Sequence, residues 1–209
     1  MKDLIILIAD FDTENVLQGL LPRLEHVYGI RNFTYDIRKH PNRDNGCMNE
    51  SVEFLRPFCS AYRHALVVFD KEGSGQEAKS REAIESSIEG ALANNGWAAE
   101  NVAAIAIEPE VENWIWVNST NMSKELNWNE TKTLFAWLQE NGWREQDASK
   151  PTRPKEALEA VLRKTKKPRS ASIYKNIAEK VTFTKCEDPA FLKLIETMKL
   201  WFAPAENPA

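Results

Sequence analysis

Apolar and polar positions alternate along the first half of this chain in blocks, and the blocks predict its secondary structure. Short runs that are apolar at nearly every position are typical of strands buried on both faces of a sheet. Between the runs, apolar residues recur at helical spacing, as Val16, Leu17, Leu20, Leu21 and Leu24 do. The predicted strands are 4–9, 32–37, 64–69 and 102–107, and the predicted helices between them are one of roughly 14 residues capped by Asp12 or Thr13, then 50–62 and 76–95.

This order of strand, helix and strand with short connections predicts an α/β fold. We expect a mainly parallel sheet of about four strands flanked by helices, within a core of residues 1–118. The polar, turn-rich residues 38–46 predict a mobile loop in that core.

Beyond Trp116 the strand pattern stops, and the remaining segments have helical patterns. We expect residues 119–203 to form a helical C-terminal extension packed on the core, and residues 204–209 to be a disordered tail. Asp188 is the predicted N-cap of the last helix, with Pro189 at its first position. The predicted helices are 131–141, 155–164, 172–180 and 189–202.

Composition narrows the class of protein. The chain has 209 residues, of which 43% are hydrophobic and 28% charged, and no apolar run approaches the roughly 20 residues of a membrane span. Acids at Asp3 and Asp10 bracket the first apolar run, which argues against a secretory signal, so we expect a cytoplasmic protein that does not interact with membranes. The three cysteines are widely spaced and predict neither a disulfide framework nor a structural zinc site.

The net charge of -4 is unevenly distributed, because one segment is strongly basic. Residues 150–169 hold eight Lys or Arg against Glu156 and Glu159. Such a band can hold the backbone of DNA or RNA, or it can be an ordinary solvated helix face. The predicted nucleic-acid-binding residues are Lys150, Arg153, Lys155, Arg163, Lys164, Lys166, Lys167 and Arg169.

Acidic side chains follow three of the predicted strands. Ligands of open parallel sheets bind beyond the carboxyl ends of the strands, where these side chains would converge. Clustered carboxylates repel one another, and hard oxygen ligands favour Mg²⁺ or Mn²⁺ over zinc. Capping and loop acids at ordinary strand-to-helix junctions are the alternative interpretation. The predicted metal ligands are Asp10, Asp12, Glu14, Asp70, Glu72, Glu110 and Glu112.

These motifs resemble the Toprim fold of topoisomerases, bacterial primases and overcoming-lysogenization-defect nucleases, in which a Glu after the first strand and an Asp-x-Asp pair after a later strand bind Mg²⁺. More narrowly, the chain resembles a family of small bacterial Toprim-like proteins often met near phage-defence genes. The matching segments are Asp10-Phe11-Asp12-Thr13-Glu14, Pro109-Glu110-Val111-Glu112-Asn113-Trp114, Tyr174-Lys175-Asn176-Ile177 and Pro189-Ala190-Phe191. This chain has Asp10 where the family has Glu, Phe11 where it has Gly, and Glu72 in place of the second Asp.

The resemblance implies a divalent-metal-dependent nuclease in anti-phage defence. Asp10, Asp70 and Glu72 would be the primary metal ligands, and Glu14 a general base or second-metal ligand. Lys71 would stabilise phosphate charge, unless it simply neutralises its acidic neighbours. The predicted catalytic residues are therefore Glu14, Asp70, Lys71 and Glu72.

Two other functions fit the same residues. The chain can be an inactive Toprim-like component of a multi-protein defence complex, with protein partners in place of a substrate. It can also be a small-molecule phosphatase or nucleotide-processing enzyme, which would show no salt-sensitive binding to nucleic acid.

Overall fold

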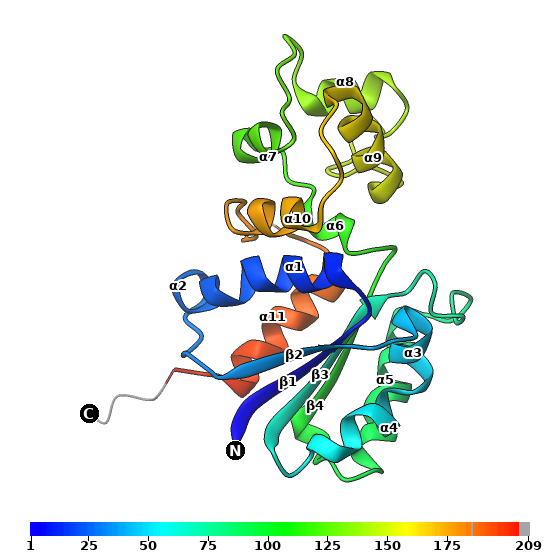
Figure 1. Cartoon of the computed structure of the whole chain (residues 1–209), viewed down its shortest axis with the longest axis vertical. Coiled ribbons are helices and arrows are strands. Elements are labelled where there is room, and N and C mark those ends of the chain that lie inside the picture. Colours follow the sequence, from blue (N-terminus) through cyan, green and yellow to red (C-terminus); the bar gives the residue numbers. More distant parts are fainter. Residues whose placement is uncertain (185, 205–209) are drawn as a thin grey trace.

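Four parallel strands form the centre of the molecule, in the order β2-β1-β3-β4 (Figure 1). The computed structural model describes residues 1–184 and 186–204. Ile6 of β1 pairs with Ile37 of β2 and Leu66 of β3, so β1 and β3 occupy the middle of the sheet. The predicted α/β fold with a four-stranded parallel sheet is thus confirmed. The strands are β1 (Lys2–Ile8), β2 (Tyr35–Lys39), β3 (Tyr62–Asp70) and β4 (Val102–Ile107).

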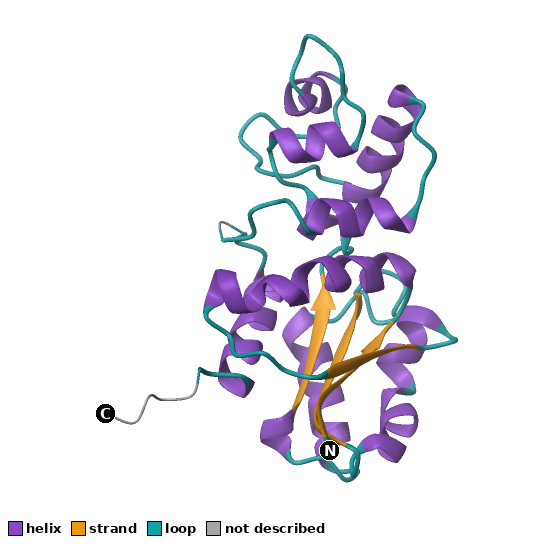
Figure 2. Ribbon diagram, turned by 60° about the vertical axis from the view of Figure 1, so that its left-hand side comes forward, coloured by secondary structure: helices purple, strands orange, loops and turns teal. Residues whose placement is uncertain are grey.

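Helices cover both faces of the sheet, which explains why β1, β3 and β4 are apolar at almost every position (Figure 2). Leu4, Ile6 and Ile8 pack into one core, whereas Ile5 and Leu7 pack into the other. Helices α1 (Phe11–Leu20) and α11 (Pro189–Trp201) lie on the first face, and α3 (Arg43–Asn49), α4 (Ser51–Leu55) and α5 (Arg81–Ala93) lie on the second.

Several helix boundaries differ from the prediction. The long first helix ends at Leu20, because Pro22 lies in the next turn and supplies no N–H, and the chain continues through short turns. The segment 38–46, predicted to be a mobile loop, contains the start of α3. Tyr62, predicted to end a helix, begins β3. The short elements are η1 (Leu21–Arg23), α2 (Leu24–Tyr28), η2 (Arg56–Phe58) and η3 (Ala99–Asn101).

After β4 the chain builds a helical lobe, residues 113–169, beyond one end of the sheet and then returns to the sheet (Figures 1 and 2). Helix α10 packs on α1 so closely that a Cβ at Gly19 would lie 2.7 Å from Cβ of Ala178. Helix α11 packs beside β4 as part of the layer over the sheet. Of the predicted tail, only Pro204 lies within the described residues. The remaining helices are α6 (Glu112–Ile115), α7 (Thr120–Glu125), α8 (Leu134–Glu140), α9 (Pro154–Thr165) and α10 (Ala171–Ala178).

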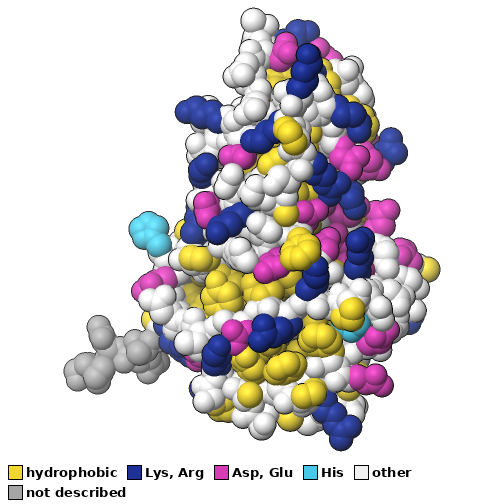
Figure 3. Space-filling view, in the orientation of Figure 1, with side chains coloured by type: hydrophobic (Ala, Val, Ile, Leu, Met, Phe, Trp, Pro, Cys, Tyr) yellow, Lys and Arg dark blue, Asp and Glu magenta, His cyan; other side chains and the backbone are white. Residues whose placement is uncertain are grey.

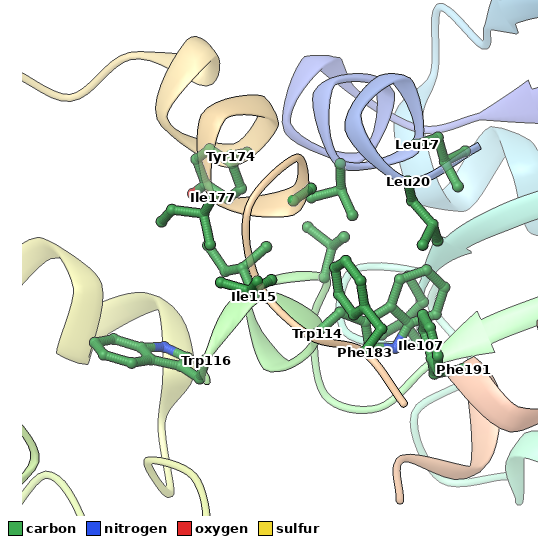
Figure 4. Packing of buried hydrophobic residues seen from close by; sticks show 14 of the residues in the cluster. Leu17, Leu20, Ile107, Trp114, Ile115, Trp116, Tyr174, Ile177, Phe183 and Phe191 are labelled. Carbon is green, nitrogen blue, oxygen red and sulfur yellow. The ribbon is translucent and has the colours of Figure 1, made fainter. Parts of the chain in front are cut away.

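Aromatic packing joins α11 to the segment that follows β4 (Figure 4). The ring of Phe191 stacks on Phe183 at 5.2 Å and meets Trp114 edge-on at 5.4 Å. The carboxylate of Asp188 accepts a hydrogen bond from Nε1 of Trp114 at 2.9 Å and caps α11 through the N–H of Phe191 at 3.0 Å. The predicted N-cap is therefore confirmed, and it also anchors the polar end of a buried tryptophan.

Within residues 1–184 and 186–204, no helix is both long and apolar enough to cross a membrane. The three cysteines, Cys47, Cys59 and Cys186, are all free thiols.

Candidate active site

The strand order brings the predicted acidic segments to one edge of the sheet. Strands β1, β3 and β4 are neighbours and parallel, so their carboxyl ends lie together. Asp10 follows β1, Asp70 ends β3, and the turn from Glu108 to Glu112 follows β4. The backbone N–H of Lys71 donates to the carbonyl of Ile107 at 2.8 Å, which holds the last two strand ends together.

Asp70 is at the centre of this edge, and its side chain is only 7% exposed. Its Oδ1 accepts a hydrogen bond from the backbone N–H of Val111 at 2.8 Å, and its own backbone N–H donates to Oδ1 of Asp44 at 2.9 Å. Asp70 thus links the turn after β4, through its carboxylate, to helix α3, through its backbone N–H.

Burial raises the pKa of Asp70 well above its usual value, and four nearby carboxylates add to the effect. We call these five residues the carboxylate cluster: Asp10, Asp44, Asp70, Glu110 and Glu112. Negative charge here is therefore only partly neutralised by the protein. A bound cation would reduce the repulsion among these carboxylates, so the cluster has the electrostatic character of a cation site.

Asp44 belongs to the cluster although its position in the chain does not point to it. Burial raises its pKa to about 6, with a further increase from Asp10, while the hydrogen bond from the N–H of Asp70 opposes the shift. It was missed because it lies in the polar segment after β2 that was predicted to be a mobile loop. The one local signal is that it falls in the first turn of a helix, where acids are common for other reasons.

Asp10 has two roles at this edge. It is the N-cap of α1, accepting from the N–H of Thr13 at 2.8 Å, and it repels the charges of Asp44 and Asp70. The predicted caps, Asp12 and Thr13, are wrong, because the helix begins directly after Asp10 and both residues lie inside it.

Glu112 is almost fully buried and is held by two groups from the C-terminal part of the chain. The hydroxyl of Tyr174 donates to its Oε1 at 2.7 Å, and Nη2 of Arg169 lies 3.8 Å from the same atom. Burial raises the pKa of Glu112 to about 7, against the lowering effect of the tyrosine hydrogen bond. A carboxyl with a pKa near neutral pH has the value that suits a general base or acid.

Glu110 pairs with Lys155, which reaches the cluster from the start of α9. The distance from Nζ to Oε1 is 3.2 Å. Burial raises the pKa of Glu110, and the ammonium of Lys155 offsets part of that rise. Lys155 also interacts electrostatically with Glu112 and Asp70, so the lobe supplies a cation to the centre of the cluster.

The other predicted site residues lie outside the cluster. Asp12 pairs with Arg169 at 2.9 Å, and Lys71 pairs with Glu108 at 2.8 Å. Glu72 is exposed, although its charge raises the pKa of Glu110. Glu14 accepts from Gln18 and faces a shallow groove beside β2, so its position does not support the predicted role of general base.

The basic band does not form one open cationic surface. Six of its eight cations pair with carboxylates, and Figure 3 shows acidic and basic side chains interspersed over the lobe. Lys150 lies 3.6 Å from Sγ of Cys186, and Lys166 is exposed at the end of α9. The pairs are Arg153 with Glu156, Lys155 with Glu110, Arg163 with Glu159, Lys164 with Glu130, Lys167 with Glu125, and Arg169 with Asp12.

The donor chemistry of the cluster fits a hard divalent cation, since all its side-chain donors are carboxylate oxygens and their charge is under-compensated. In the part of the chain that the structure describes, however, no three His, Cys, Asp or Glu side chains are arranged as a metal-ligand group. Binding such an ion therefore requires side chains of the cluster to move toward Asp70.

A cavity of about 730 Å³ lies on the far side of the turn that carries Glu110 and Glu112. Its walls include Glu108 and Asn113 from that turn, and Arg144 and Lys150 from the lobe. The walls include no member of the carboxylate cluster, so this cavity and the titrating carboxylates are separate features.

Comparisons of the chain with family models, with curated proteins and with solved structures return no match. The Toprim resemblance therefore stays a prediction that rests on the motifs alone.

Proposed function

We propose that this chain is a divalent-metal-dependent nuclease that cleaves phosphodiester bonds of DNA or RNA, with the carboxylate cluster as its centre. The observation that carries the proposal is the buried Asp70, whose pKa is raised by burial and by four surrounding carboxylates at the carboxyl edge of a parallel sheet. The anti-phage setting comes from the motif resemblance.

In this proposal Asp10, Asp44 and Asp70 would hold Mg²⁺ or Mn²⁺. A divalent ion there would polarise the phosphate and lower the pKa of a bound water. Lys155 and Arg169 would bind the phosphate oxygens, because both already point their charges at the cluster from the lobe. Glu112, with a pKa of about 7, would accept the proton of the attacking water.

One observation favours the alternative, an inactive component of a multi-protein complex. Lys155 and Arg169 already form ion pairs with Glu110 and Asp12, and no three described ligands converge for a metal. Cations from the protein would then have replaced the ion, and the site would be structural.

Thermal unfolding with added Mn²⁺ or Mg²⁺ separates the two functions. The wild type should gain about 5–10 °C in Tm at a metal concentration near 100 times Kd, since that occupancy is worth about 2.7 kcal/mol. Asp70→Asn keeps the size and the acceptor oxygen but removes the charge, and should lose the metal response. Asp147→Asn is the matched control, because Asp147 is exposed in the lobe and should respond like wild type.

Cleavage of labelled single- and double-stranded DNA and RNA by the same three proteins completes the test. The proposal expects metal-dependent cleavage by wild type and Asp147→Asn, and none by Asp70→Asn. A wild type that neither responds to metal nor cuts any of the four substrates would favour the inactive component. An equal metal response in wild type and Asp70→Asn would place the ion away from the cluster and contradict the proposal.

A further inference from the structure

The two edge strands of the sheet differ in whether other groups bond to their outward backbone N–H groups. At the β4 edge, side chains of α5 accept the outward backbone N–H groups: Glu89 accepts from Ala104 at 3.0 Å, and Glu85 accepts from Ala106 at 3.0 Å. Lys193 of α11 in turn pairs with both glutamates. That edge is closed to further strand pairing.

The β2 edge has no comparable cover. The carbonyl of Thr34 and the N–H of His40 both bond to β1, so the even-numbered residues of this strand face their neighbour in the sheet. The backbone groups of Tyr35, Ile37 and Lys39 therefore point outward. Within the described residues, no side chain or second strand bonds to their N–H groups.

The sequence of β2, Tyr35-Asp36-Ile37-Arg38-Lys39, is self-complementary when read antiparallel about Ile37. In that register Asp36 of each copy lies opposite Arg38 of the other, twice by symmetry. A centre on Asp36 or on Arg38 would instead place like charges opposite each other. Of these three registers, only the one centred on Ile37 pairs opposite charges and also pairs the outward N–H and C=O groups of the two strands.

The geometry of an antiparallel ladder reinforces this register. Ile37 would face its own copy as a hydrogen-bonded pair, since both its N–H and its C=O point outward. Asp36 and Arg38 would then form non-hydrogen-bonded pairs, in which side chains approach most closely. Asp36 already accepts on Oδ2 from Nζ of Lys2 at 2.7 Å and from the hydroxyl of Tyr62, so its Oδ1 is the oxygen left for Arg38 of the other copy. Arg38 is exposed and has no ion pair among the described residues, so it can reach that oxygen.

Apolar surface flanks the strand on both faces of the sheet. Figure 3 shows charged side chains at the level of β2 lying between two hydrophobic areas. Phe33 and Tyr35 are half-buried against the core on one face, as are Phe54 and Phe58 on the other. A second copy would cover part of both areas.

We propose that two copies of this chain associate through β2, antiparallel and centred on Ile37, to form one continuous eight-stranded sheet. The contact is isologous, so each copy gives and receives the same two charge pairs. The proposal is independent of any catalytic activity, because β2 carries none of the carboxylate cluster.

Light scattering coupled to size-exclusion chromatography tests the proposal with two charge variants. Wild type at a concentration on the order of 100 µM should have the mass of a dimer, given a Kd of about 10 µM. Arg38→Glu alone places Asp36 opposite Glu at two sites. Asp36→Lys alone places Lys opposite Arg38 at two sites and also removes the pair that Asp36 forms with Lys2 inside each copy. Each should raise Kd about 30-fold, the equivalent of about 2 kcal/mol, which at this concentration lowers the dimeric share of the chains from about four fifths to about one third and lowers the measured mass accordingly.

An equimolar mixture of the two variants should restore the dimer, because every facing pair in the heterodimer again has opposite charges. Recovery of the dimer also shows that both variants are folded. Lys79→Glu, which reverses an exposed charge away from β2, is the control and should behave as wild type. A monomeric wild type, single variants that remain dimeric, or a mixture of folded variants that stays monomeric would each overturn the proposal.

Discussion

Glu112 offers a direct test of the charge imbalance in the carboxylate cluster. Its carboxyl is buried and its pKa is raised from an ordinary value of 4.5 to about 7. A difference of this size costs about 3 kcal/mol, since one pKa step corresponds to about 1.4 kcal/mol. Because the folded pKa lies above the unfolded one, the cost is absent below pH 4.5, grows between 4.5 and 7, and is complete above pH 7.

Glu112→Gln should remove that cost and retain most of the packing. The amide oxygen can still accept the hydrogen bond that the hydroxyl of Tyr174 donates at 2.7 Å. At pH 8 in the absence of metal, the free energy of unfolding should therefore rise by as much as about 3 kcal/mol. The gain should vanish toward pH 4.5, where both proteins are neutral at this position.

Urea unfolding followed by the fluorescence of the seven tryptophans measures this difference at each pH. Glu100→Gln is the control, because Glu100 is exposed and forms no ion pair among the described residues, so its effect should be small at every pH. A Glu112→Gln protein that is less stable than wild type at pH 8 would refute the reasoning. The ionised carboxylate would then be held by Arg169 more strongly than burial opposes it.

Three further predictions concern packing and thiol chemistry. Phe191→Ala should lower the free energy of unfolding by about 3–5 kcal/mol, because it removes a buried ring that contacts Phe183, and chemical denaturation measures the loss. Gly19→Ala should cost about 1–3 kcal/mol, since the added Cβ would lie 2.7 Å from Ala178 and force α1 and α10 apart; a thermal midpoint equal to wild type would contradict this. Burial raises the pKa of the Cys47 thiol, so Cys47 should react with a disulfide reagent only after unfolding, which peptide mapping of the labelled protein can check.

Local sequence patterns were sufficient to predict the sheet and part of the candidate site. The apolar runs predicted β1, β3 and β4, and β4 matches its predicted range, because a strand buried on both faces needs apolar residues at every position. The mixed sequence of β2 gave a shifted prediction, 32–37 instead of Tyr35–Lys39. Asp10, Asp70, Glu110 and Glu112 were predicted from their places at strand ends, and the strand order brings them to one edge.

Long-range packing determined what the patterns did not predict. Asp44 joins the cluster only because α3 packs against β3, and no local spacing reports that contact. Glu14 shares a motif with Asp10, but it lies one helical turn further along α1, where it accepts from Gln18 and lines the groove beside β2. The basic band is continuous in the sequence, but the fold gives four of its eight cations a carboxylate partner from another segment.

The lobe is attached to the rest of the molecule at the carboxylate cluster, so the position of the lobe affects the charge of the cluster. The chain leaves the sheet through the turn that carries Glu112 and comes back at Arg169, which lies 3.8 Å from that same carboxylate. The lobe is thus an insertion between β4 and the last two helices, α10, which packs on α1, and α11, which packs beside β4, with both of its attachment points at the cluster. A displacement of the lobe must carry Lys155 and Arg169 with it, so the geometry of the insertion and the ionisation of the acids beneath it cannot change independently.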